Sequence, residues 1–185
     1  MTFVFFLFAF LLSTINYHAA AIDFCVADLK GGRTPAGYPC KLPKDVTVED
    51  FVFSKFVAGT PNQFNFSTTS VVVDNFPALN GLGFSIARAD LQEGAVVPFH
   101  SHPDATETLS EGDVFVIPKG LLHFGINSGK GATSGVGVFT SENPSIEILD
   151  LALFGNNLDS AIVEKTTFLD AAQVKKLKGF FKGSG

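Results

Sequence analysis

Three of the four histidines in the chain lie near its middle with one glutamate: His100, His102, Glu107 and His123. Alternate side chains of a β-strand point to the same face, so His100 and His102 can offer two ring nitrogens to one ion. Glu107 has the opposite parity, but a Pro-Asp dipeptide follows His102, and a turn or bulge there can return the carboxylate to that face. His123 must come from a second strand, introduced by a Pro-Lys-Gly turn.

Three neutral imidazoles and one carboxylate suit a divalent transition ion that keeps room for water or substrate. The carboxylate favours manganese or iron over a closed structural zinc site. A single histidine is more often a core residue or a surface group. The grouping of three histidines with a glutamate is therefore what predicts a metal centre.

The composition predicts one all-β domain. The chain has 185 residues, with 21 Phe, 18 Gly, 9 Pro and no Trp, which indicates an aromatic core cut by many turns. Its formal net charge is −5, which argues against a nucleic-acid partner because no basic patch is available to neutralise phosphates.

Many short apolar runs separated by turn residues favour a β-sandwich or barrel. Two short helices follow, one capped by Asn157 and ending at Glu164, the other beginning with Thr167 and Asp170 and ending at Gly179. The predicted strands are Asp50–Phe56, Thr69–Val73, Leu82–Leu91, Val96–His102, Val114–Ile117, Leu121–Ile126, Val136–Thr140 and Ile146–Phe154.

The start of the chain predicts secretion. An apolar run from Phe3 to Leu12, followed by polar and then small residues, is typical of a signal peptide covering residues 1–21, which leaves 22–185 as the mature domain. The run is too short to span a membrane, and no later stretch reaches about 18 apolar residues. Asn65-Phe66-Ser67 is an acceptor sequon for N-glycosylation.

The only two cysteines, Cys25 and Cys40, are expected to form a disulfide, because a secreted chain matures in an oxidising compartment. A cysteine metal site is the alternative, but the close Cys-x-x-Cys spacing that such sites use is absent.

Two motifs resemble those of the cupins. Gly-x5-His-x-His-x4-Glu runs from Gly94 to Glu107, and Gly-x5-Pro-x-Gly-x2-His-x3-Asn runs from Gly112 to Asn127. Within the cupins the chain is similar to plant germin-like proteins, in the auxin-binding-protein-like branch. The stretches that carry this resemblance are Asp23–Leu29, Phe76–Gly83 and Val163–Leu169.

The resemblance implies a glycosylated β-barrel or jelly roll of the apoplast or cell wall, with short C-terminal helices. It implies manganese bound by His100, His102, Glu107 and His123, and a hexamer in which the C-terminal helices clasp neighbouring subunits. Family activities include oxalate oxidation and superoxide dismutation, and many members have no established activity. For this chain we expect superoxide dismutation, with a role in defence or development, and no oxalate oxidase activity.

A receptor function is the alternative. In it the ion is structural, or a pocket lined by residues such as Phe84, Phe99 and Phe124 holds a small carboxylate such as an auxin.

The chain departs from the family pattern between its two motifs. The first motif should continue from Glu107 through six residues to a glycine, with a further segment before the second motif, yet only four residues separate Glu107 from Gly112. The missing piece is on the order of 20 residues, or two or three strands. Its loss should open one wall and leave unpaired strand edges, so we expect this form to bind metal weakly or not at all. The gap is compatible with a spliced or mis-joined gene model, a genuine shortened protein that still folds, or a decaying gene copy. In function, an inactive truncated isoform is a further alternative.

Overall fold

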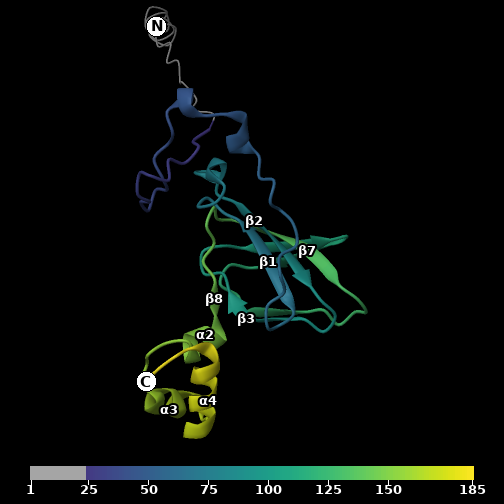
Figure 1. The fold of residues 1–185 in the computed structure, drawn as a ribbon, viewed down its shortest axis with the longest axis vertical. Coiled ribbons are helices and arrows are strands. Elements are labelled where there is room, and N and C mark those ends of the chain that lie inside the picture. The colour runs from purple at the N-terminus through teal and green to yellow at the C-terminus, as the bar shows by residue number, and fades with distance from the viewer. Residues whose placement is uncertain (1–23) are drawn as a thin grey trace, which may run out of the picture.

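The computed structural model describes residues 24–185, so the predicted signal peptide, residues 1–21, lies outside the described part. The described chain forms three tiers: an N-terminal arm, a β-sandwich and a group of C-terminal helices (Figure 1). The all-β prediction with short C-terminal helices is confirmed.

The larger sheet has five antiparallel strands in the order β1-β2-β7-β4-β5. β2 and β7 pair along their whole length, with Ser85 opposite Phe139 and Leu91 opposite Thr133. β4 then pairs with β7 on one side and β5 on the other. The bounds are β1 Phe66–Val71, β2 Ser85–Leu91, β4 Glu107–Glu111, β5 Asp113–Ile117 and β7 Thr133–Phe139.

The smaller sheet has three strands in the order β6-β3-β8. Its central strand is β3 (Val96–Ser101), flanked by β6 (His123–Ile126) and β8 (Glu147–Ile148). The pairing of β3 with β6 shifts register between Val97 and His100, where His100 comes opposite His123. This irregularity brings two of the predicted ligands directly across from one another.

The predicted Cys25–Cys40 disulfide is present and closes a loop within the N-terminal arm, while apolar packing holds the arm to the larger sheet. A core cluster of Ala27, Val71, Val73 and Leu79 joins the arm to β1 and to the short 3-10 helix η3 (Pro77–Leu79). The arm also contains two single-turn 3-10 helices, η1 (Pro43–Asp45) and η2 (Val48–Phe51).

The C-terminal helices are α2 (Leu149–Phe154), α3 (Ser160–Thr167) and α4 (Ala171–Phe181). They share a core of Phe154, Val163 and Val174. None of the described helices is long and apolar enough to cross a membrane.

Helix capping corrects the predicted boundaries. Asp159, not Asn157, caps α3 by accepting a hydrogen bond from Ala161 N. Asp170 caps α4 and forms a capping box with Gln173, so α4 starts after Asp170 and runs past Gly179 to Phe181.

Two strand predictions were wrong and one strand was missed, each for a local reason. Asp50–Phe56 is not a strand, because Asp50 and Thr47 form a capping box that starts η2 instead. Most of Ile146–Phe154 is helix α2, whose Leu-Asp-Leu-Ala-Leu-Phe sequence is rich in helix formers. The prediction also missed β4, a mixed polar stretch that is a strand because β7 and β5 pair with both of its edges.

Candidate metal centre

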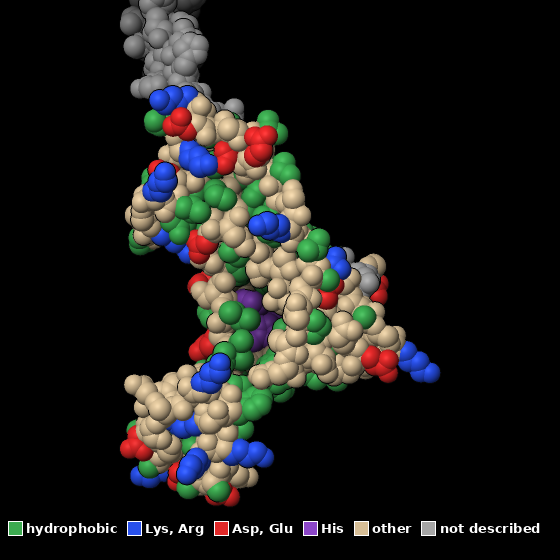
Figure 2. Space-filling view, viewed as in Figure 1, with side chains coloured by type: hydrophobic (Ala, Val, Ile, Leu, Met, Phe, Trp, Pro, Cys, Tyr) green, Lys and Arg blue, Asp and Glu red, His purple; other side chains and the backbone are tan. Residues whose placement is uncertain are grey.

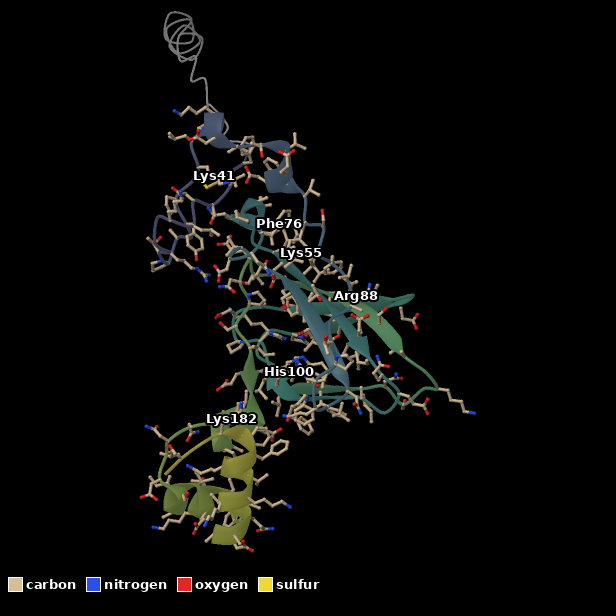
Figure 3. All side chains as sticks on the ribbon, in the orientation of Figure 1. Lys41, Lys55, Phe76, Arg88, His100 and Lys182 are labelled. Carbon is tan, nitrogen blue, oxygen red and sulfur yellow. A yellow bond between two sulfur atoms is a disulfide. The ribbon has the colours of Figure 1, made fainter. Side chains whose placement is uncertain are left out.

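Both sheets contribute to the cluster of predicted ligands. His100 lies on β3 and is labelled in Figure 3, and His102 follows directly after that strand. His123 is the first residue of β6, and Glu107 is the first residue of β4 in the larger sheet. The carboxylate therefore arrives from a separate strand, not from a bulge in the strand that carries the first two histidines.

One potential ligand atom from each of the four residues lies within 4.8 Å of the others. Nε2 of His123 is 3.1 Å, and Nε2 of His102 is 3.4 Å, from the same Glu107 oxygen, Oε2. The rings of His100 and His123 are 4.0 Å apart between centroids. His100, His102 and Glu107 are buried, and His123 is partly buried. The shortened chain thus still brings the four side chains together.

Backbone carbonyls fix the protonation of all three rings. Nδ1 of His100 lies 2.8 Å from the Pro98 carbonyl, and Nδ1 of His102 lies 2.8 Å from the Ser145 carbonyl. Nδ1 of His123 lies 2.9 Å from the Leu121 carbonyl. A carbonyl only accepts, so each Nδ1 carries the hydrogen and each neutral ring presents the lone pair of Nε2. Metal-binding histidines commonly have this arrangement, because it orients the ring and selects the tautomer.

Those lone pairs face the Glu107 carboxylate, so electron-rich groups lie close together and repel one another unless a positive charge lies between them. Burial lowers the pKa of His102, but the hydrogen bonds to Glu107 and to the Ser145 carbonyl, with the charge of Glu107, outweigh burial and raise that pKa. Burial also works against ionised Glu107, yet the contact with His102 and the charges of the imidazoles hold its pKa below the usual range. A proton on His102 or a bound cation can supply this positive charge. The donor set therefore fits a divalent metal ion.

The pKa of His100 shifts in the opposite direction to that of His102. Burial is the main cause that holds its pKa below the ordinary value, and the neighbouring histidines reinforce the effect. At neutral pH this ring is therefore uncharged and available as a ligand without losing a proton.

The cluster is reachable from the surface. The histidine side chains are visible on the sandwich, in the hollow between the N-terminal arm and the C-terminal helices (Figure 2). Such access leaves room for water or a small molecule beside an ion.

Of the three residues predicted to line a ligand pocket, Phe99 and Phe124 lie next to His100 and His123 along their strands. Phe99 and Phe124 pack on each other with centroids 4.9 Å apart and are both about half exposed, as is Phe84. Phe99 precedes His100 on β3, and adjacent strand residues point to opposite faces. The histidines take the inner face, so the rings of Phe99 and Phe124 lie on the other face.

Two residues that support the cluster were not predicted. Ser145 supplies the carbonyl that holds His102, and its hydroxyl donates to Asp104 Oδ2, which ties the loop after β7 to the turn after β3. Gly137 on β7 leaves the space that the Glu107 carboxylate occupies. A backbone carbonyl and a missing side chain leave no signal in a single sequence.

The fold and the metal-type cluster together define a cupin. The sequence model described as Cupin matches residues 58–109 and 106–175. Oxalate oxidase in complex with the substrate analogue glycolate superposes with a TM-score of 0.79 and 32% identity, over 86% of this chain and 94% of that one.

The chain belongs to the germin-like proteins, in the branch that includes the auxin-binding relatives. It is 45% identical to an auxin-binding protein of Prunus persica over 96% of this chain and 95% of the relative. It is 46% identical to Germin-like protein subfamily 3 member 1 of Arabidopsis thaliana over 97% and 98% of the two chains.

The same comparisons locate the gap. The alignment with the Prunus persica protein runs over 203 residues while this chain has 185, so at least 18 aligned positions have no residue here. The two cupin matches meet at residues 106–109, which end the first and begin the second. The relatives therefore carry a segment between Glu107 and the second motif that this chain lacks.

A Gly137→Ala variant is expected to bind manganese about 10- to 100-fold more weakly, the range typical of residues that orient metal ligands. A methyl group at Gly137 would lie 3.0 Å from Oε1 of Glu107 and 3.4 Å from the Phe139 ring, so the carboxylate must shift. Gly135→Ala is the matched control, since nothing lies within 4 Å of a methyl group there. Titration of both variants with manganese, followed by dialysis and metal analysis, measures the difference. Equal affinities would show that Glu107 is not fixed by this contact.

Manganese affinity is expected to fall about tenfold or more per pH unit below pH 6.5, where free imidazoles gain protons. The sign follows from the cluster: His102, whose pKa is raised by Glu107, must release its proton before it can bind an ion. Affinity should therefore rise from pH 6 to pH 8 and then level off. Equilibrium dialysis across this range measures it, and a flat profile would exclude histidine ligation.

Proposed function

We propose that this chain is a secreted germin-like protein of the apoplast or cell wall that holds divalent manganese through His100, His102, Glu107 and His123. We propose further that it dismutes superoxide there, in defence or development, and that it does not oxidise oxalate.

One observation carries the metal assignment. The three Nε2 lone pairs and the ionised Glu107 face a common point, because backbone carbonyls take up every Nδ1 hydrogen. A divalent cation satisfies all four groups at once. The carboxylate and the three nitrogens favour manganese or iron, and the resemblance to the germin-like proteins favours manganese.

Dismutation matches what this site offers. Two superoxide ions and two protons give one O2 and one H2O2, so no further oxidant or reductant is required. A bound manganese supplies the one-electron redox chemistry, and the protein supplies ligands and access. The three histidines and Glu107 would hold the ion, while the hollow at the histidines admits a small anion.

Non-enzymatic binding of a small carboxylate such as an auxin is the second candidate. The observation that favours it is the 45% identity with a protein named as auxin-binding. In this case the metal, or the positive charge at His102, would hold the ligand carboxylate in the hollow.

The location and assembly form part of the proposal. Asn65 is exposed in a turn before β1, so a glycan attached there would project into solvent. The apolar N-terminal run supports secretion. A hexamer is proposed on the family resemblance alone.

The decisive test is the metal content per chain of the purified secreted protein, with intact mass and superoxide dismutase activity measured on the same sample. We expect manganese at up to one ion per chain, more easily removed by chelators than from a full-length relative because one wall is open. His102→Ala should lose metal and activity together while the fold persists. Auxin binding that survives metal removal would favour the receptor, and a folded chain without metal or activity would favour the inactive isoform.

A further inference from the structure

Strand β5 is the last strand of the larger sheet, and none of the strands in residues 24–185 pairs with its outer edge. Its three central residues are unusually exposed for apolar side chains: 69% for Val114, 65% for Phe115 and 54% for Val116. Strand edges in monomeric proteins are commonly protected by charged residues, prolines or covering loops. Within β5 only the first residue, Asp113, is charged, so this edge is open to pairing.

A hydrogen bond just past the end of β5 shows which backbone groups of this strand face outward. The backbone N–H of Lys119 donates to Thr106 Oγ1, on the side of β4. Because N–H directions alternate along a strand, those of Phe115 and Ile117 also face β4, and those of Val114 and Val116 point outward. The outer edge thus offers two N–H and two C=O groups.

We propose that two copies of this chain pair antiparallel through β5, about a two-fold axis at Phe115. In this register Val114 of each copy lies opposite Val116 of the other, which allows four backbone hydrogen bonds across the junction. Phe115 lies opposite Phe115 in a non-hydrogen-bonded pair, where the side chains are closest. The two larger sheets then form one continuous sheet.

Charge complementarity favours a second copy as the partner. The apolar stretch lies between Asp113 and, two residues past its end, Lys119, both of them exposed. With Asp113 opposite Ile117, Lys119 of the other copy is the diagonal neighbour of Asp113, within reach of a long side chain. The two-fold axis produces this attraction twice. A register shifted by one residue would instead place inward-facing groups opposite outward-facing ones.

The comparisons explain why this edge exists. The relatives have a segment of at least 18 residues before the second motif that is absent here, and β5 begins directly after that point. Strand pairing between two copies would cover an edge that relatives with the extra segment have residues to cover themselves. This contact is separate from the proposed clasp of the C-terminal helices.

A cysteine cross-link tests the register. A Phe115→Cys variant should form an intermolecular disulfide under mild oxidation, because directly opposite residues of a non-hydrogen-bonded pair have Cα atoms about 4.5 Å apart. Val114→Cys and Val116→Cys are matched controls on the same strand, since each would lie diagonal to its own copy at about 7–8 Å. Each single control should cross-link at least about tenfold more slowly. The native cysteines are already paired, so the added thiol is the reactive one.

Val116→Pro provides an independent readout. It removes an outward N–H and no hydrogen bond to β4, so the fold should persist while the dimer weakens. Sedimentation velocity should show a dimer, or a multiple of it, for the parent protein and half that size for the variant. Equal cross-linking by all three cysteine variants, an assembly unchanged by Val116→Pro, or a parent protein that stays monomeric would each overturn the proposal. Pairing of β5 with a different protein would leave Phe115→Cys unable to link to itself and would also overturn it.

Discussion

A Glu107→Gln variant is expected to lose manganese affinity by at least about 100-fold, more than the range typical of residues that only support metal ligands. Glutamine keeps the size of the side chain but removes the negative charge that all three imidazoles face. Oε1 of Glu107 lies against Gly137 and Oε2 faces the rings, so the neutral amide fits the same space and the fold should persist. Metal content after dialysis, with a thermal melt of the metal-free protein, measures both expectations.

Glu147→Gln is the control for charge. Glu147 lies on β8, opposite Ser101 next to the cluster, yet its side chain is exposed. It changes the net charge equally and should leave manganese affinity within about twofold, because exposed charges are well screened. If both variants lost metal equally, a general electrostatic attraction would explain binding and Glu107 would not be a ligand.

The Glu107→Gln variant also tests whether a proton on His102 neutralises the carboxylate when no metal ion is bound. In the metal-free protein Glu107 raises the pKa of His102, so removing its charge should lower that pKa. Nuclear magnetic resonance titration of the His102 ring can follow this change without any metal present. A His102 pKa that stays unchanged in Glu107→Gln would show that the contact between the two residues is not formed in solution.

The predicted ligands could be chosen from the sequence because their evidence is local. Two histidines at alternate positions require only that a strand forms, and strand alternation then places them together. The position of Glu107 is different. It depends on the pairing of β4 with β7, about thirty residues further along, and register over such a distance is set by the whole sheet.

The contacts that orient each histidine ring could not be predicted from the sequence either, because they also depend on segments that are distant along the chain. The Ser145 carbonyl meets His102 only because the loop after β7 returns to the turn that contains Asp104. The gap could be predicted, and so could the open strand edge that is present at β5, but the sequence did not show that the four ligands still converge. Convergence survives because His100, His102 and His123 come from the smaller sheet region, and Glu107 needs only its pairing with β7.

Replacing both Cys25 and Cys40 with serine is expected to lower the free energy of unfolding by about 3 kcal/mol, since the disulfide closes a loop of 15 residues in the unfolded chain. Packing of the folded arm does not depend on this bond: Ala27 lies in the buried core cluster, and Tyr38, Phe53 and Phe56 pack against that cluster. Asn80 also bonds the Tyr38 carbonyl and the sulfur of Cys25. Urea unfolding of the metal-free variant should show a lower midpoint.

Addition of a thiol reductant to the parent protein should produce the same shift in midpoint, and it should not change the variant. Metal affinity should change far less than stability, because every ligand lies in the sandwich and none in the arm. The arm does reach the centre indirectly: Asn80 donates to the Tyr38 carbonyl of the arm, the N–H of neighbouring Gly81 donates to Glu142, and three residues after Glu142 the Ser145 carbonyl holds His102. If the variant lost manganese as completely as Glu107→Gln while still folded, this indirect connection would be a main determinant of the site, and the arm would have to be counted as part of the metal centre.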